Sequence, residues 1–248
     1  MWLIGLDDTD VPDSRGTGRL ARMLADELAR RGCADHGVTR HQLLVHPAVP
    51  YTSHNSAACI AVDADGADMA DTFARACEFV AARSPSGSDP GVCLAPAEAV
   101  AEPLRAFAQR TQQEFVLRQE AEALAMVAGC RLAGLGGTCD GVIGALAAVG
   151  LRAEGNDGRF IGLGRIRELG ERVRVHEILD AGVHAVVSAA AAQPQADDWV
   201  ETLDWVRPRL LGGRAVLFVE RSKNDGVDWI VADRGKRSRV RQRGRAAR

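Results

Sequence analysis

Three of four consecutive residues near the start of the chain are aspartates. Asp7, Asp8 and Asp10 follow the apolar segment 2–6, which the sequence predicts to be a buried strand. Carboxylates this close together repel one another unless a cation lies between them. Mg²⁺ suits such a cluster, because it takes oxygen ligands and bridges carboxylates to phosphates. Aspartates that cap backbone amides in a solvated turn would give the same pattern, so both interpretations stay open.

A threonine between two glycines follows seven residues later. Gly16, Thr17 and Gly18 come directly after Arg15 and open an amphipathic helix predicted over 18–31. Thr17 is the expected N-cap of that helix. The free N–H groups and the positive dipole end at the same place would also favour a phosphate group. The two roles are compatible, and the neighbouring aspartates favour the second.

A second glycine-rich loop lies near the middle of the chain. Gly134, Gly136 and Gly137 precede Thr138 and Asp140, and a helix of small residues follows. Successive backbone N–H groups in such a loop can form an anion nest, although a close-packed turn would need the same glycines. No Gly-Lys-Ser/Thr follows, so this is not a Walker A loop. Two glycine loops beside an acidic strand end favour a site for ATP and Mg²⁺.

The remaining pattern mixes strands with helices. We expect strands at 42–49, 57–62, 92–94, 159–163, 173–179 and 184–188, helices at 68–82, 97–110, 115–129 and 197–210, and a hairpin of 215–220 with 229–233. This order predicts an α/β (α+β) protein. We place one domain at 1–152, a smaller one at 153–234 and a tail at 235–248.

Charge is unevenly distributed over the 248 residues. Eight of the last fifteen residues, 234–248, are Lys or Arg and none is acidic, so the rest of the chain has 23 basic against 33 acidic residues. An acidic body argues against a broad nucleic-acid surface. The tail is predicted to be disordered and solubilising, or to contact RNA phosphates. No apolar run reaches the roughly 20 residues that span a bilayer, so we expect a cytoplasmic protein with no membrane contact.

The order of these motifs resembles a known family. Ile-Gly-Leu-Asp-Asp-Thr-Asp at 4–10 with Gly16-Thr17, Pro-Tyr-Thr-Ser-His-Asn at 50–55, and Gly-Val-Ile-Gly-Ala-Leu-Ala-Ala-Val-Gly at 141–150 are similar to segments of the tRNA(Ile) 2-agmatinylcytidine synthetase family, TiaS. The resemblance covers about 1–150. It implies a kinase-like α/β domain followed by a ferredoxin-like domain.

The resemblance also implies roles for individual residues. The family binds ATP and Mg²⁺ through an acidic cluster, which corresponds here to Asp7, Asp8 and Asp10, and its autophosphorylated threonine corresponds to Thr17. Family members phosphorylate the C2 carbonyl of a cytidine and then let the amine of agmatine displace phosphate. In the loop at 50–55 the family has a Lys and an Arg. His54 and Asn55 are the expected substrate residues in this chain.

Two departures limit what the resemblance implies. The family's OB-fold and zinc ribbon are not expected here, and the six cysteines lack the C-x-x-C spacing of a zinc ribbon. We therefore expect an ATP- and Mg²⁺-dependent phosphotransferase or ligase that acts on a small-molecule amine or on RNA. The rival hypothesis is a non-catalytic nucleotide- or RNA-binding module that works with a partner through its Arg-rich tail.

Overall fold

The chain folds into two compact units. The computed structural model describes residues 1–49, 54–63 and 66–232, with unit 1 spanning Met1–Ile161 and unit 2 beginning at Gly162. The predicted tail at 235–248 and the first part of the loop at 50–55 lie outside the described residues. Among the helices that are described, none combines the length and the apolar character needed to span a bilayer.

Unit 1 contains most of the regular structure. Its elements are β1 (Trp2–Asp7), α1 (Thr17–Arg30), β2 (Ala34–Gln42), β3 (Ser56–Asp63), α2 (Met69–Ala81), β4 (Gly91–Pro96), the 3-10 turn η1 (Ala97–Ala99), α3 (Glu102–Arg110), α4 (Arg118–Val127), β5 (Arg131–Gly134), α5 (Gly141–Glu154) and β6 (Arg159–Gly162). The strands form one sheet in the order β5-β4-β1-β3-β2-β6. The predicted boundary at residue 152 falls inside α5, and unit 1 continues beyond it.

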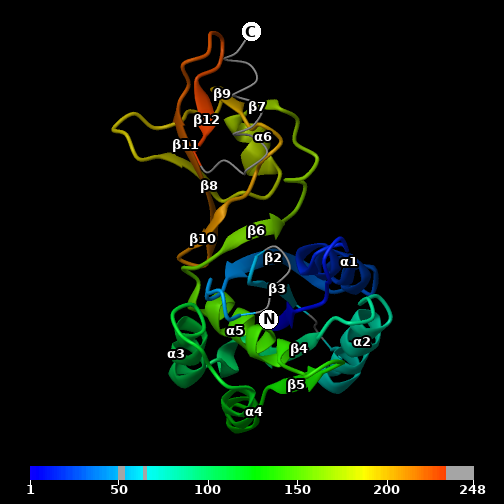
Figure 1. Ribbon diagram of the computed structural model, residues 1–248. Helices are drawn as coiled ribbons and strands as arrows, with labels where there is room; N and C mark the ends of the chain where they lie inside the picture. Colours follow the sequence, from blue (N-terminus) through cyan, green and yellow to red (C-terminus); the bar gives the residue numbers. More distant parts are fainter. Residues whose placement is uncertain (50–53, 64–65, 233–248) are drawn as a thin grey trace. The chain divides into compact units, whose positions relative to one another are not determined.

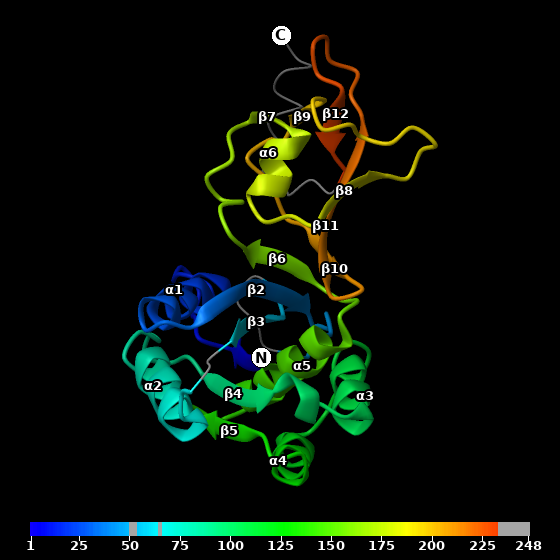
Figure 2. The same ribbon diagram turned by 180° about the vertical axis from the view of Figure 1, so that it is seen from behind.

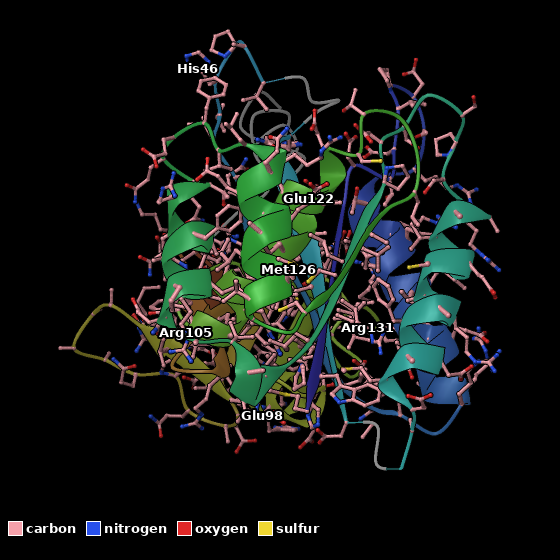
Figure 3. All side chains as sticks on the ribbon, turned by 90° about the horizontal axis from the view of Figure 1, so that it is seen from below. His46, Glu98, Arg105, Glu122, Met126 and Arg131 are labelled. Carbon is pink, nitrogen blue, oxygen red and sulfur yellow. The ribbon has the colours of Figure 1, made fainter. Side chains whose placement is uncertain are left out.

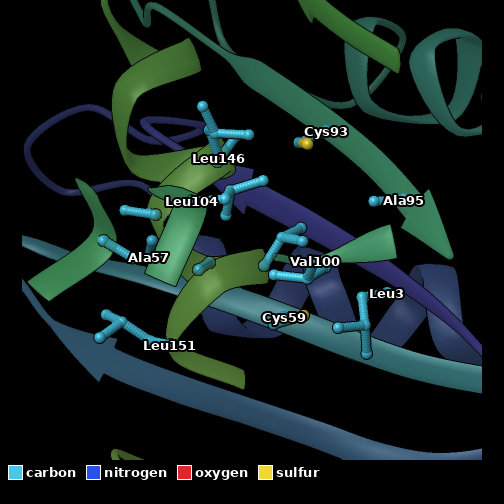
Figure 4. Packing of buried hydrophobic residues seen from close by; sticks show 14 of the residues in the cluster. Leu3, Ala57, Cys59, Cys93, Ala95, Val100, Leu104, Leu146 and Leu151 are labelled. Carbon is cyan, nitrogen blue, oxygen red and sulfur yellow. The ribbon is translucent and has the colours of Figure 1, made fainter. Parts of the chain in front are cut away.

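Alternation along the strands gives the unit-1 sheet two covered faces. Leu3, Cys59 and Cys93 point to the side of α3, α4 and α5, whereas Ile4 and Ile60 point to the side of α1 and α2. Figure 1 and Figure 2 show these helices on opposite sides of the sheet, and Figure 3 shows the same layers from below. Figure 4 shows the tight packing on the α5 side. Burial on both faces explains why β1 is a continuous apolar run.

β1 lies at the centre of this sheet. It pairs antiparallel with both β3 and β4, and Asp7, its last residue, is opposite Gly91. The small residues of α5 allow that helix to lie unusually close to the strands, since a Cβ on Gly5 would overlap the carbonyl oxygen of Ala145. The fold therefore brings the acidic end of β1 next to the N-terminus of α5.

Unit 2 is a smaller α+β body. Its elements are β7 (Arg172–Arg174), α6 (Val175–Asp180), β8 (Ala185–Ser188), β9 (Trp199–Glu201), β10 (Arg209–Leu211), β11 (Arg214–Arg221) and β12 (Trp229–Val231). The strand order is β10-β11-β12-β9-β7, with β8 parallel to β11. The mixed α/β (α+β) class predicted from the sequence, a larger part followed by a smaller one, is confirmed.

Three local predictions were wrong. The strand expected at 42–49 ends at Gln42, because the residues after it leave the sheet. The strand expected at 173–179 is mostly α6, whose start is stabilised by the Glu177 carboxylate accepting a hydrogen bond from the Arg174 amide at 2.6 Å. The helix expected at 197–210 is not formed, since Leu203 and Asp204 both have a φ of 55° and β9 joins the sheet.

A fully buried histidine connects β2 to the segment after α5. His41 is 0% exposed; its Nδ1 lies 2.8 Å from Asp157 Oδ1 and its Nε2 lies 2.8 Å from Thr39 Oγ1. Gln112 Nε2 donates to the other Asp157 oxygen at 3.1 Å. Burial lowers the pKa of His41 below the usual 6.5, against the opposing effect of Asp157. The folded protein therefore keeps His41 neutral while the unfolded chain takes up a proton in mild acid.

We expect His41→Gln to reduce the stability of unit 1 and to remove part of its acid sensitivity. Loss of two buried hydrogen bonds should cost about 2 kcal/mol at pH 7. Because the folded-state pKa is lowered, the parent protein loses stability as pH falls below about 6.5, and the variant should lose less over that range. Urea denaturation of both proteins at about pH 7 and pH 5 measures this. Equal losses between the two pH values would contradict the assignment.

Candidate active site

A cavity of about 480 Å³ opens in unit 1 where β1 ends and α5 begins. It has the size of a small-molecule site. One end is acidic and the other is apolar. The lining residues that matter for the chemistry are Asp7, Asp8, Asp10, Thr17, Leu43, Leu44, His54, Asn55, Phe115, Arg118, Thr138, Asp140, Gly141 and Gly144. The structure thus brings together the first aspartate cluster, Thr17, the histidine loop and part of the second glycine loop.

The aspartate turn is held close to α5. A Cβ on Gly144 would overlap the Asp7 carboxylate, so this glycine leaves the space that the carboxylate occupies. Asp8 has a φ of 50°, a left-handed conformation that aspartate tolerates better than most residues. Its carbonyl oxygen accepts a hydrogen bond from the Asp89 amide at 3.1 Å. The turn is therefore fixed by the backbone of two neighbouring segments.

Crowding and burial make these carboxylates hard to ionise. Burial, together with the charges of Asp8 and Asp10, raises the pKa of Asp7 to about 7. Burial and the charges of Asp89, Asp10 and Asp140 raise the pKa of Asp8 to about 6. Near neutral pH the site is thus short of positive charge. An added cation would offset the repulsion between these groups.

Geometry limits what protein ligands alone can supply to a metal. No cluster of three or more His, Cys, Asp or Glu side chains within 1–49, 54–63 and 66–232 is arranged to hold a metal ion. Mg²⁺ commonly takes only one or two protein carboxylates and completes its shell with water and substrate phosphates. The acidic end of the cavity fits that kind of binding and does not fit a preformed cage.

Thr17 lies at the start of α1 with its hydroxyl pointing to the aspartate turn. The N-cap of α1 is Gly16, so the expected N-cap role of Thr17 was wrong. Its Oγ1 instead donates to Asp10 Oδ1 at 3.1 Å and accepts from Thr9 Oγ1 at 3.1 Å. Thr17 is 6% exposed but still lines the cavity. A carboxylate is in position to take its hydroxyl proton.

The second glycine loop forms an anion nest that the protein fills with its own carboxylate. The Asp89 side chain accepts from the amides of Thr138 at 3.1 Å, Cys139 at 2.6 Å and Asp140 at 3.1 Å. The Thr138 hydroxyl also donates to Asp89, at 2.5 Å. Three successive amides are therefore already satisfied. Sequence reasoning missed Asp89, although its place in Asp-Pro-Gly just before β4 marks a turn.

The other predicted residues divide between the cavity and the surrounding packing. His54 lines the cavity, and Asn55 both lines it and donates from its amide to the Leu44 carbonyl at 2.8 Å. The predicted residues absent from the cavity lining are Arg15, Gly16, Gly18, Gly134, Gly136 and Gly137. Gly18 faces Ile161, and Gly134 faces Cys139, each without room for a Cβ. These two glycines serve packing.

Two further lining residues were also missed from the sequence. Arg118 is the first residue of α4, and Phe115 precedes that helix with 55% of its surface exposed. The ring of Phe115 meets His46 edge to face, with 4.9 Å between ring centroids. Neither residue belongs to a motif, so only the three-dimensional arrangement identifies them.

The geometry can be set beside known proteins. No family model matches the chain. It is 36% identical over 151 residues to the tRNA(Ile) 2-agmatinylcytidine synthetase TiaS of Methanocorpusculum labreanum, covering 59% of this chain and 34% of the relative. It is 35% identical over 156 residues to the TiaS of Pyrococcus horikoshii, covering 59% of this chain and 35% of that protein. The chain thus spans about a third of the length of these curated relatives.

A solved structure agrees with the sequence comparison. The crystal structure of TiaS with its isoleucine tRNA, AMPCPP and agmatine has a TM-score of 0.54 and 25% identity, covering 72% of this chain and 44% of that one. The likeness includes the mixed fold and the N-terminal sequence that carries the acidic cluster. Over its N-terminal part, this chain is therefore a TiaS-like protein and a partial relative of the tRNA(Ile) 2-agmatinylcytidine synthetases.

Proposed function

We propose that the protein is an ATP-dependent ligase of the agmatinylcytidine synthetase type. It activates a carbonyl acceptor by phosphorylation and then lets an amine displace the phosphate. The observation that carries the proposal is the cavity that places Asp7, Asp8 and Asp10 beside Thr17. The TiaS relatives, one of them solved with AMPCPP, agmatine and an isoleucine tRNA, support ATP, an amine and an RNA as the reactants.

The acidic end is the proposed place for the phosphates of ATP together with Mg²⁺. Asp7, Asp8 and Asp10 would hold the ion, and the raised pKa values of Asp7 and Asp8 support a site that needs a cation. Bound Mg²⁺ supplies charge neutralisation at phosphate oxygens. The protein's own contribution is to fix the carboxylates against α5 and to keep the reacting groups aligned.

Thr17 is the proposed phosphoryl acceptor within the protein. Its hydroxyl donates to Asp10, so Asp10 can take the proton as Thr17 Oγ1 bonds to phosphorus. The bond between the terminal phosphorus of ATP and its bridging oxygen breaks, and ADP leaves. For the external acceptor, the carbonyl oxygen bonds to phosphorus in the same way. The amine nitrogen then bonds to the activated carbon, orthophosphate leaves with the former carbonyl oxygen, and the amine loses its proton.

His54, Asn55, Thr138 and Asp140 are the proposed substrate and nucleotide contacts at the rim of the reaction centre. All four line the cavity. In this proposal unit 1 corresponds to the ATP-binding kinase-like domain predicted for 1–152. The smaller, ferredoxin-like domain predicted for 153–234 would assist in holding the substrate. The other predicted ATP-binding residues, Arg15, Gly16, Gly18, Gly134, Gly136 and Gly137, would act by shaping the loops.

A product assay tests the proposal. The protein is incubated with ATP, Mg²⁺, agmatine and an isoleucine tRNA transcript, and nucleosides, nucleotides and the intact protein are analysed by mass spectrometry. We expect a cytidine that has gained agmatine, ADP as the nucleotide product, and one phosphate on Thr17. Omitting agmatine should leave the tRNA unmodified. Unchanged tRNA and unchanged ATP in the complete mixture would overturn the proposal.

The basic tail keeps a second function under consideration. Eight of its fifteen residues are basic, which favours contact with RNA phosphates through 234–248. If the chain is a non-catalytic nucleotide- or RNA-binding module, truncation after residue 233 should reduce RNA affinity steeply and ATP turnover should be absent from both forms. If the chain is a ligase, ATP turnover by the full-length protein rejects that alternative.

A further inference from the structure

The cavity is strongly unbalanced in charge. Within the part of the chain that the structure describes, five carboxylate residues line it: Asp7, Asp8, Asp10, Glu114 and Asp140. Among the described lining residues, Arg118 is the one side chain with a permanent positive charge. A polyphosphate brought into such a site would meet repulsion from most of its walls. One guanidinium in this position therefore has a large influence on which ligands the cavity accepts.

Arg118 is held at the cavity wall by fixed partners. Its Nη1 donates to the carbonyl oxygen of Thr138, and its Nε lies 3.3 Å from a Glu122 carboxylate oxygen, one turn further along α4. The Arg118 side chain is 35% exposed. Figure 3 shows Glu122 on the outer helix of this side of unit 1. The guanidinium has five N–H donors, so these contacts leave donors for a ligand.

The position of Arg118 on its helix is unfavourable for stability. It is the first residue of α4, where the helix dipole presents partial positive charge and disfavours a cation. The capping contact at this end is made by Glu120, whose carboxylate accepts from the Leu117 amide at 3.1 Å. Arg118 thus takes no part in the capping that starts the helix. Its location is better explained by what it faces than by helix stability.

The filled anion nest strengthens this argument. The amides of Thr138, Cys139 and Asp140, which a phosphate would otherwise use, already bind Asp89. The neighbouring donor group at the cavity wall is the Arg118 guanidinium, attached to the same loop through the Thr138 carbonyl. Charge-assisted, forked hydrogen bonds are the strongest that a side chain can offer to a phosphate.

We propose that Arg118 is a phosphate-binding residue of the site, contacting the polyphosphate chain of the nucleotide through its guanidinium. The proposal rests on the proposed function in so far as it assumes that a nucleotide enters this cavity. It identifies Arg118 as the cation that replaces the glycine-loop amides in phosphate recognition.

A binding series tests the proposal. Isothermal titration of ATP, AMP and adenosine is compared in the parent protein, Arg118→Gln and Arg118→Lys, all in Mg²⁺. We expect Arg118→Gln to weaken ATP binding about 10- to 100-fold and adenosine binding by less than about twofold. Arg118→Lys should recover part of the loss, since it keeps the charge without the fork. The melting temperature should stay level or rise, because a cation leaves the N-terminus of α4.

A matched control and a clear contradiction complete the design. Arg131→Gln removes an exposed arginine at the start of β5, outside the cavity lining, and should leave all three affinities unchanged. Equal loss of ATP and adenosine binding in Arg118→Gln would indicate a structural role and overturn the proposal, as would unchanged ATP binding. If the parent protein binds none of the three nucleotides, the proposed function fails; if it binds them and Arg118→Gln matches it, only the Arg118 proposal fails.

Discussion

Replacing Asp8 by Asn is expected to reduce ATP turnover at least a hundredfold while the fold stays intact. The carboxylate of Asp8 is one of three that crowd the acidic end of the cavity, and its pKa is raised to about 6 by burial and like charges. Asparagine keeps the shape of the side chain and tolerates its φ of 50°, but it removes the negative charge that a cation would bind. Loss of one such electrostatic contact in a phosphoryl-transfer site has an effect of about this size.

Stability gives a second measurement on the same variant. For Asp7 and Asp8 the folded-state pKa lies above the ordinary 3.8, so the metal-free parent loses stability as pH rises from about 4 to about 7. Asp8→Asn should lose less over that range, and its melting temperature at neutral pH should be equal or higher. Thermal melts with and without Mg²⁺ measure this, and the Mg²⁺-dependent increase should shrink in the variant.

Asp13→Asn is the matched control for Asp8→Asn. Asp13 has a φ of 69°, so the same substitution is made at another left-handed aspartate, and this residue is exposed and outside the cavity lining. Its turnover should equal that of the parent. If Asp8→Asn consumes ATP at the parent rate, Asp8 has no essential role in ATP chemistry.

Gly5→Ala is expected to destabilise unit 1 by about 3 kcal/mol or more. The added Cβ would overlap the carbonyl oxygen of Ala145, and a helix backbone does not move aside as a flexible side chain can. Overpacking of a close-packed interior typically costs about 1–3 kcal/mol, and backbone contact belongs at the upper end. Moving α5 away from β1 would also displace Gly144 from Asp7, so nucleotide binding should fall together with stability.

Chemical denaturation followed by a probe in unit 1 measures the effect of Gly5→Ala. Gly170→Ala is the comparison, since a Cβ there meets nothing within 4 Å. That variant should melt within a degree or two of the parent. Gly5→Ala with parental stability would show that the close approach of α5 to β1 is not required.

Local sequence patterns anticipated much of unit 1. The apolar run of β1, the amphipathic spacing of α1 and the glycine loop before α5 each depend on contacts near in sequence or on simple periodicity. Asp7, Asp8, Asp10 and Thr17 were found in the same way, because seven residues of turn bring Thr17 back to Asp10. Their common cavity follows from that short connection.

The residues that sequence reasoning missed depend on distant contacts. Asp89 reaches a loop about fifty residues further along the chain, and Arg118 reaches the same loop from α4. In unit 2, β9 forms because it pairs with β7 and β12, which outweighs the helical appearance of its own segment. Neither side-chain pairing across a fold nor strand partnership is encoded in a short window of sequence.

The composition of α5 has a consequence for how the site comes into existence. Half of its fourteen residues are glycine or alanine, and its glycines weaken the helix in isolation by up to about 1 kcal/mol each. Such a segment gains its order from the sheet beneath it. Helix formation, sheet assembly and creation of the aspartate pocket should consequently occur as one cooperative event, with no partly folded state that retains the ability to capture a nucleotide.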